Sequence, residues 1–179
     1  MKTTFVVLAL TLAGIARADV ADSANNGFTA RIVLTIQASP DEVYRRLVGN
    51  VGDWWNSAHT FSGDAHNLTI EAKPMGCFCE KLPSGGARHM EVVNFVPGKT
   101  LVMVGGLGPL QSLAVAASMT VQLAPADGAT KLTVTYAVGG YVPGGLNGYA
   151  GPVDGVLTQQ FTRLKSYVEH GDPAPKALK

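Results

Sequence analysis

The sequence predicts an α+β fold: a seven-stranded antiparallel sheet curled around one long C-terminal helix, with two short helices between the first and second strands. Six short β-like runs follow one another between residues 67 and 138 with turn residues between them, as is typical of antiparallel strands. Near the end of the chain, apolar residues recur at helical spacing. A sheet with one solvated face must bury the other, and this helix is the only large element available to cover it.

The first strand and the helix after it have clear local signals. Residues 28–37 alternate and are rich in β-branched side chains, which predicts a strand. Residues 39–42, Ser-Pro-Asp-Glu, form a capping box with proline at the first helical position. We expect this helix to end near Gly49 and a second, short helix to carry Trp54 and Trp55.

The remaining elements are the six strands and the long helix. The strands are expected over residues 67–73, 76–82, 88–96, 99–106, 115–124 and 130–138. The helix should begin near Pro152 and stop at Gly171. Its apolar stripe consists of Val153, Leu157, Phe161, Leu164 and Val168.

The N-terminal residues 1–18 have the features of a signal peptide. Lys2 supplies a positive charge, residues 5–15 are apolar, and residues 16–18 read Ala-Arg-Ala, a small-residue cleavage motif. A transmembrane helix needs about 20 apolar residues, so this run is too short to be one. We therefore expect export, to the periplasm or outside the cell, with cleavage after Ala18.

The rest of the chain is expected to be one domain, spanning residues 28–170. The polar residues 19–27 read as a flexible lead-in and residues 171–179 as a disordered tail. Cleavage would leave 12 basic and 13 acidic residues, since Lys2 and Arg17 are removed from the 14 basic ones. That balance gives no sign of a nucleic-acid or anionic-membrane partner.

Several motifs resemble those of the SRPBCC superfamily, whose members include START and birch-pollen-allergen-like proteins of the helix-grip fold. They are ASPDEVYRRL after the first strand, the Trp-Trp pair, PMGCFCE, HMEVVNFVPGKTLVM, and the Tyr136 strand with its glycine loop and long helix. The resemblance covers residues 28–169 and is greatest to the group related to the heat-shock protein 90 ATPase activator. In PMGCFCE, Met75 replaces a usual glycine and Cys77 a usual basic residue. The superfamily includes lipid and hormone carriers, polyketide aromatase/cyclases and co-chaperones, so the resemblance implies a fold rather than an activity.

The two cysteines, Cys77 and Cys79, are the only ones in the chain. Residues two apart in a strand have Cα atoms about 6.6 Å apart, beyond the 5.5–6 Å or so that disulfides prefer, so a disulfide here would be strained and easily reduced. A three-residue turn would pair Lys73 with Cys77, directing Phe78 and Glu80 inward and both cysteines outward. A two-residue turn would reverse these faces, but the proline and glycine of residues 73–76 favour the three-residue turn.

Three residues are candidates for general acid/base chemistry: Glu80, His59 and His89. An inward carboxylate in an apolar cavity needs a raised pKa or a polar partner, and histidine is suited to proton transfer near neutral pH. Two of the three also have a structural interpretation: Glu80 as part of a salt bridge and His59 as a loop cap. Cys77 and Cys79 could in principle bind a metal together with His59, Asp64, His66 or His89. None of these spacings is a known ligand signature, so we expect no metal and no cofactor.

We expect a binding protein for a small, mostly apolar molecule of lipid, polyketide or aromatic type, held between the sheet and the C-terminal helix. The alternative is a cyclase or dehydratase-like enzyme that uses the acid/base candidates in the same cavity. Residues 105–110 and 139–152 should form glycine-rich rims. The candidate ligand-binding residues are Trp54, Trp55, Phe61, Phe78, Glu80, Tyr141, Tyr149, Val153, Leu157 and Phe161.

Overall fold

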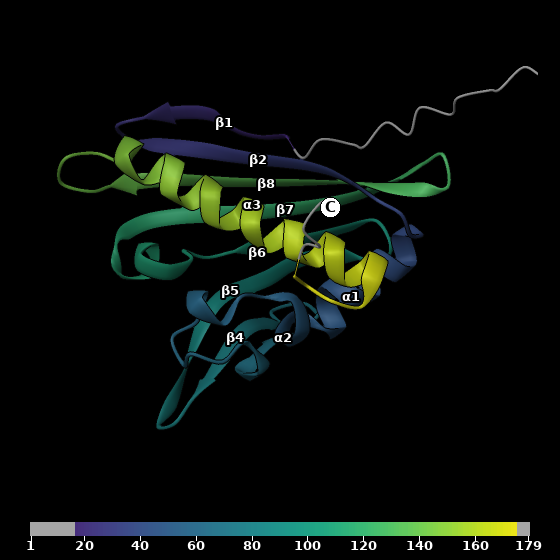
Figure 1. The fold of residues 1–179 in the computed structure, drawn as a ribbon. Helices are drawn as coiled ribbons and strands as arrows, with labels where there is room; N and C mark the ends of the chain where they lie inside the picture. The colour runs from purple at the N-terminus through teal and green to yellow at the C-terminus, as the bar shows by residue number, and fades with distance from the viewer. Residues whose placement is uncertain (1–16, 175–179) are drawn as a thin grey trace, which may run out of the picture.

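The computed structural model describes residues 17–174 and has the predicted α+β architecture, an antiparallel sheet with a long C-terminal helix (Figure 1). The sheet has eight strands rather than seven, in the order β1-β2-β8-β7-β6-β5-β4-β3. The strands are β1 (Arg17–Ala24), β2 (Gly27–Ile36), β3 (Leu68–Ile70), β4 (Cys77–Leu82), β5 (Gly85–Val96), β6 (Thr100–Val104), β7 (Ala114–Ala126) and β8 (Ala129–Tyr141).

The additional strand is β1, which pairs antiparallel with the edge of β2. The expectation of a flexible lead-in over residues 19–27 is therefore wrong for residues 19–24 and for Gly27, where β2 begins. These residues lack the β-branched alternation that marks a strand, but their backbone groups can still pair with an open strand edge. Residues 1–16 of the predicted signal peptide lie outside the described part of the chain.

The helices begin and end largely where local signals predict. In α1 (Pro40–Gly49), the Ser39 side chain accepts a hydrogen bond from the Glu42 N–H at 3.3 Å, as the capping box requires. The other helical elements are α2 (Val51–Trp54), α3 (Asn147–His170) and the 3-10 turns η1 (Ser57–His59), η2 (Ala65–Asn67) and η3 (Gly108–Ser112). Among the described residues, no helix is long and apolar enough to cross a membrane.

Helix α3 begins at Asn147, before the expected start at Pro152. Its first turns are rich in glycine and poor in helix propensity, but Leu146 and Ala150 are buried there, and this packing outweighs the weak local preference. Gly171 ends the helix in the left-handed conformation, as predicted. The Ser166 hydroxyl contacts the backbone oxygens of Asp172 and Ala174, so the start of the expected tail is held against α3.

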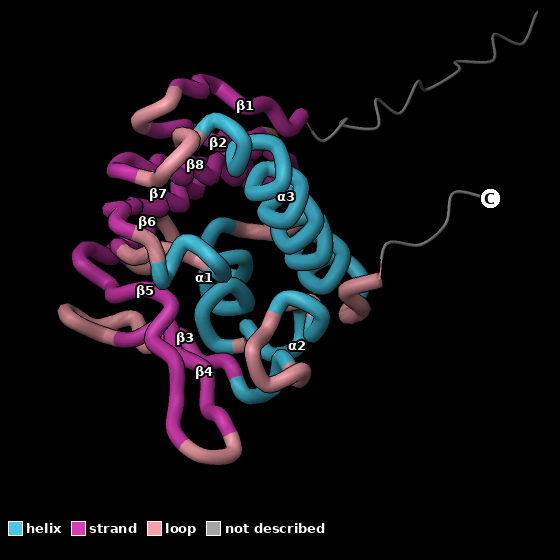
Figure 2. The backbone as a smooth tube through the Cα atoms, turned by 90° about the vertical axis from the view of Figure 1, so that its left-hand side faces the viewer, coloured by secondary structure: helices cyan, strands magenta, loops and turns pink. Residues whose placement is uncertain are grey.

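The sheet forms an arc, with α3, α1 and α2 on its concave side (Figure 2). Alternate residues of β2 point into this side and are buried, from Phe28 to Ile36. The apolar stripe of α3 faces them, with Leu157, Phe161 and Leu164 fully buried. The core therefore lies between the sheet and the helices, as the sequence pattern predicts.

In β3 and β4 the side chains point to the predicted faces, but the two strands pair in a different register. Ile70, rather than Ala72, pairs with Phe78, so the expected pairing of Lys73 with Cys77 is wrong. The connection is longer than three residues because Gly76 packs directly on the Glu71 carbonyl, while hydrogen bonds of 3.0 and 2.8 Å tie Met75 and Gly76 to Val92 of β5. The register moves by two residues, and an even shift keeps every side chain on its face.

Gly76 should therefore be intolerant of a side chain. A Cβ atom added there would collide with the Glu71 backbone oxygen, and we expect Gly76→Ala to lower the free energy of unfolding by about 1–3 kcal/mol. The matched control is Gly155→Ala, in α3, where an added Cβ has no neighbour within 4 Å; it should raise stability by about 0.5–1 kcal/mol. Urea unfolding of both variants measures the difference, and equal effects would contradict the close-approach argument.

Candidate functional site

A β-bulge in β5 determines which side chains reach the interior. Phe78 pairs with Met90, but the next residue of β4, Cys79, pairs with Arg88, so His89 is an extra residue on β5. Because of this insertion, His89 and Met90 are both buried although they are consecutive. His89 and Glu91, which are two residues apart, therefore do not share a face.

The cysteines lie on β4 directly opposite the bulge. Cys77 and Cys79 are joined in a disulfide with their Cα atoms 5.2 Å apart, less than the 6.6 Å or so of an extended strand. Both are half-buried, whereas Phe78 between them is buried, so the pair is on the face opposite to Phe78, as predicted. The ease of reduction stays a prediction.

Glu80 and His89 form a buried pair. Their side chains are 0% and 8% exposed, and His89 Nε2 lies 2.9 Å from Glu80 Oε2. The backbone N–H groups of Phe61 and Ser62 also donate to the two carboxylate oxygens. Burial alone would raise the pKa of Glu80, but the hydrogen bonds from Ser62, Phe61 and His89 outweigh it and lower the pKa below its ordinary value. Glu80 therefore has a polar partner and remains ionised.

Aromatic rings surround the histidine. The rings of Phe61 and Phe78 each lie 5.3 Å from the imidazole, centre to centre, and Trp55 meets Phe78 edge to face at 5.5 Å. Phe61 is 52% exposed, so it covers His89 from the solvent side. The loop that carries Phe61 is held in this position by the Glu80 carboxylate.

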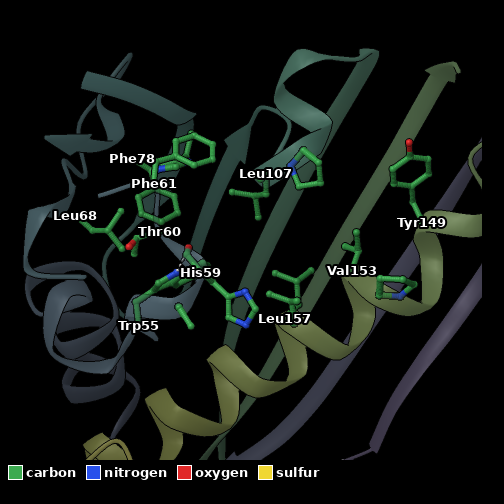
Figure 3. A pocket seen from close by; sticks show the side chains of 16 residues that line it. Trp55, His59, Thr60, Phe61, Leu68, Phe78, Leu107, Tyr149, Val153 and Leu157 are labelled. Carbon is green, nitrogen blue, oxygen red and sulfur yellow. Dashed lines mark hydrogen bonds between the residues drawn. The ribbon is translucent and has the colours of Figure 1, made fainter. Parts of the chain in front are cut away.

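These rings form one wall of a cavity of about 320 Å³. In Figure 3, the aromatic residues and His59 face Val153 and Leu157 of α3 across the cavity, with Tyr149 further along the helix and Leu107 above. The lining is mostly apolar. It consists of Trp55, Ala58, His59, Thr60, Phe61, Leu68, Phe78, His89, Leu107, Gly108, Pro109, Tyr149, Pro152, Val153, Val156 and Leu157.

Four of the expected ligand-binding residues do not line this cavity. Trp54 and Phe161 are buried beneath it with their rings 6.0 Å apart. Tyr141 is 73% exposed at the end of β8, and Glu80 lies behind His89. All four were predicted from their residue type. Their positions on the strands and helices, however, determine whether their side chains reach the cavity.

His59 lines the cavity but is exposed. Its Nε2 lies 3.1 Å from Gln159 Oε1 of α3, and its carbonyl accepts a hydrogen bond from the Trp55 indole at 3.0 Å. The first contact connects η1 to α3, and the second connects η1 to the residue that follows α2. They agree with the structural reading of His59 as a residue that stabilises its loop.

The rim formed by residues 105–110 depends on Tyr136, which sequence reasoning did not connect with the site. The Tyr136 hydroxyl accepts from the Leu107 N–H at 3.0 Å and donates to the Gly105 carbonyl at 3.2 Å. Burial raises the pKa of this phenol to about 12, so it stays protonated and keeps its donor. A core tyrosine thereby positions Leu107, Gly108 and Pro109 over the cavity.

No model of a known protein family matches this chain, and neither does any curated protein sequence. Solved structures do match its fold. CalU16 from Micromonospora echinospora is 13% identical with a TM-score of 0.57, over 91% of this chain and 89% of that one. The Aha1 dimer from Colwellia psychrerythraea is 16% identical with a TM-score of 0.56, over 80% and 97%. Ara h 8.0201 is 16% identical with a TM-score of 0.54, over 79% and 97%.

These three proteins are SRPBCC helix-grip proteins, and this chain has the same fold. The resemblance inferred from its motifs is therefore confirmed for the fold. At these identities the similarity carries no information about a reaction or a ligand, which must be argued from the cavity itself.

Glu80 should make stability depend on pH. The folded state lowers the pKa of Glu80, so in acid the unfolded state binds more protons than the folded state. The carboxylate therefore adds to the free energy of unfolding above the unfolded pKa of about 4.5. This contribution is lost as pH falls through the lower, folded-state pKa. We expect Glu80→Gln to unfold more easily than wild type by about 1.5–3 kcal/mol at pH 7, with the difference shrinking below about pH 4.5. Urea titrations at several pH values measure this, with Glu71→Gln on the exposed turn as control. A difference that is constant with pH would contradict the role of the carboxylate charge.

Proposed function

We propose that this protein binds one small, mostly apolar molecule in the cavity between β4–β5, the η3 rim and α3. The observation that carries the proposal is the cavity lining, which is apolar and aromatic with a few polar groups, the usual character of a small-molecule site. A volume of about 320 Å³ lies near the lower end of such sites. This size favours a compact aromatic or polyketide-type molecule over a long-chain lipid.

We further propose that the protein acts after export, with residues 1–18 removed. The support is the sequence pattern of residues 1–18 together with the Cys77–Cys79 disulfide, because disulfides persist chiefly in oxidising compartments. Residues 19–24 of β1, which this cleavage would leave in the chain, pair with residues 27–31 of β2.

Protein purified from its native compartment tests both proposals at once. We expect an intact mass that begins at Asp19 and a small organic molecule in the solvent extract. Val153→Trp places a large ring in the cavity and should abolish the bound molecule, whereas Val96→Trp, on an exposed site of β5, should retain it. Equal ligand content in the two variants would contradict this site, and a mass that includes residues 1–18 would contradict export.

The Glu80–His89 pair favours a second candidate function, catalysis of a proton transfer on the bound molecule. A carboxylate that holds an imidazole in one orientation is a common way to prepare a general base. If the protein is an enzyme of the cyclase or dehydratase type, His89→Phe should lower kcat by about a hundredfold or more while the bound molecule is retained. Unchanged turnover in this variant would remove His89 from catalysis.

A further inference from the structure

His89 presents one ring nitrogen that the fold leaves without a partner. Nε2 is occupied by Glu80 at 2.9 Å, whereas Nδ1 makes no hydrogen bond to any residue between 17 and 174. Nδ1 is also not one of the buried unpaired polar atoms in that range, so it is accessible. Because His89 lines the cavity, a bound molecule can reach this nitrogen.

The environment of Glu80 determines what Nδ1 can do. The Glu80 carboxylate accepts hydrogen bonds from Phe61, Ser62 and His89, and an ionised carboxylate can only accept. Nε2 must therefore carry the proton that it donates to Glu80. When the imidazole is neutral, its other nitrogen is a hydrogen-bond acceptor, so a neutral His89 offers a lone pair on Nδ1.

The other polar groups of the cavity narrow the class of ligand further. The Thr60 hydroxyl donates to the Ser57 carbonyl at 2.7 Å, and His59 Nε2 is engaged with Gln159. The Tyr149 hydroxyl also lines the cavity, at the end formed by α3. Within residues 17–174, no lysine or arginine lines the cavity. An ionised acid would therefore enter without a lysine or arginine to pair with it, and burial of such a charge is costly.

We propose that the ligand is a compact apolar ring system with one neutral hydroxyl group, a phenol or an enol, which donates its hydrogen bond to His89 Nδ1. This inference rests on the proposed function and names the chemistry that the cavity selects. The ring system packs against Trp55, Phe78 and Leu157, and the hydroxyl fixes its orientation. Glu80 acts as a positioning residue, because it holds the tautomer that makes Nδ1 an acceptor.

Four probe molecules test which polar group the cavity selects. They are naphthol, its methyl ether, naphthalene and naphthoic acid. Calorimetry at pH 8 should show naphthol binding about tenfold more tightly than the ether, since one hydrogen bond is worth about 1 kcal/mol or slightly more. Naphthalene should bind with an affinity similar to that of the ether, and naphthoic acid more weakly than both.

Variants assign this preference to a residue. His89→Phe keeps a ring between Phe61 and Phe78 and should reduce the naphthol-to-ether ratio to about one, while naphthalene still binds. Thr69→Val, a control on the exposed face of β3 and outside the cavity lining, should keep the wild-type ratio. Glu80→Gln should lower the naphthol-to-ether affinity ratio while naphthalene still binds. A variant that merely loosened the packing would weaken the binding of all three molecules.

Ring nitrogen NMR of wild-type protein tests the tautomer without any variant. We expect a protonated Nε2 and a bare Nδ1, with the Nδ1 signal shifting on addition of naphthol and not on addition of the ether. The opposite tautomer, or equal affinities of naphthol and ether in wild type, would overturn this inference and leave the apolar site intact. Absence of binding by all four probes would overturn the proposed function and the inference with it.

Discussion

The buried carboxylate of Glu80 is the constraint on which the site depends. A charge without solvent must be surrounded by donors, and here the donors come from two segments distant in the sequence, the Phe61–Ser62 loop and the bulged residue His89. Satisfying one side chain therefore brings the loop over the sheet and turns the imidazole toward the interior. The aromatic wall of the cavity follows from this arrangement, because Phe61 and Phe78 both pack on the imidazole.

The other walls of the cavity are held in place by contacts that do not involve Glu80. Helix α3 provides the opposite wall and is fixed by its own buried stripe, and the η3 rim is held by the Tyr136 hydroxyl from the core. The β4–β5 side of the cavity thus presents the His89 ring, whereas the α3 side is apolar except for the Tyr149 hydroxyl. This separation suits recognition in which packing supplies affinity and one hydrogen bond supplies orientation.

The fold was predictable because its signals are local and agree with one another. The cap at Ser39, the alternation of β2 and the stripe of α3 each specify an element, and together they leave one way to bury the apolar faces. Strand β1 was missed because it is held by backbone pairing, which side-chain patterns do not record. The inward position of His89 was missed for a different reason: a bulge changes the alternation of a strand, and its location depends on the partner strand. Trp54, Phe161 and Tyr141 were plausible by residue type, but their positions are decided by packing.

Strand β1 has a consequence for the order of events in the cell. Its pairing with β2 already includes Arg17 and Ala18, so in a folded precursor the peptide bond after Ala18 lies inside a hydrogen-bonded strand. A peptidase needs that bond as free, extended chain. If residues 1–18 are removed as proposed, cleavage and the pairing of β1 with β2 involve the same residues, so the peptidase would have to act before β1 pairs.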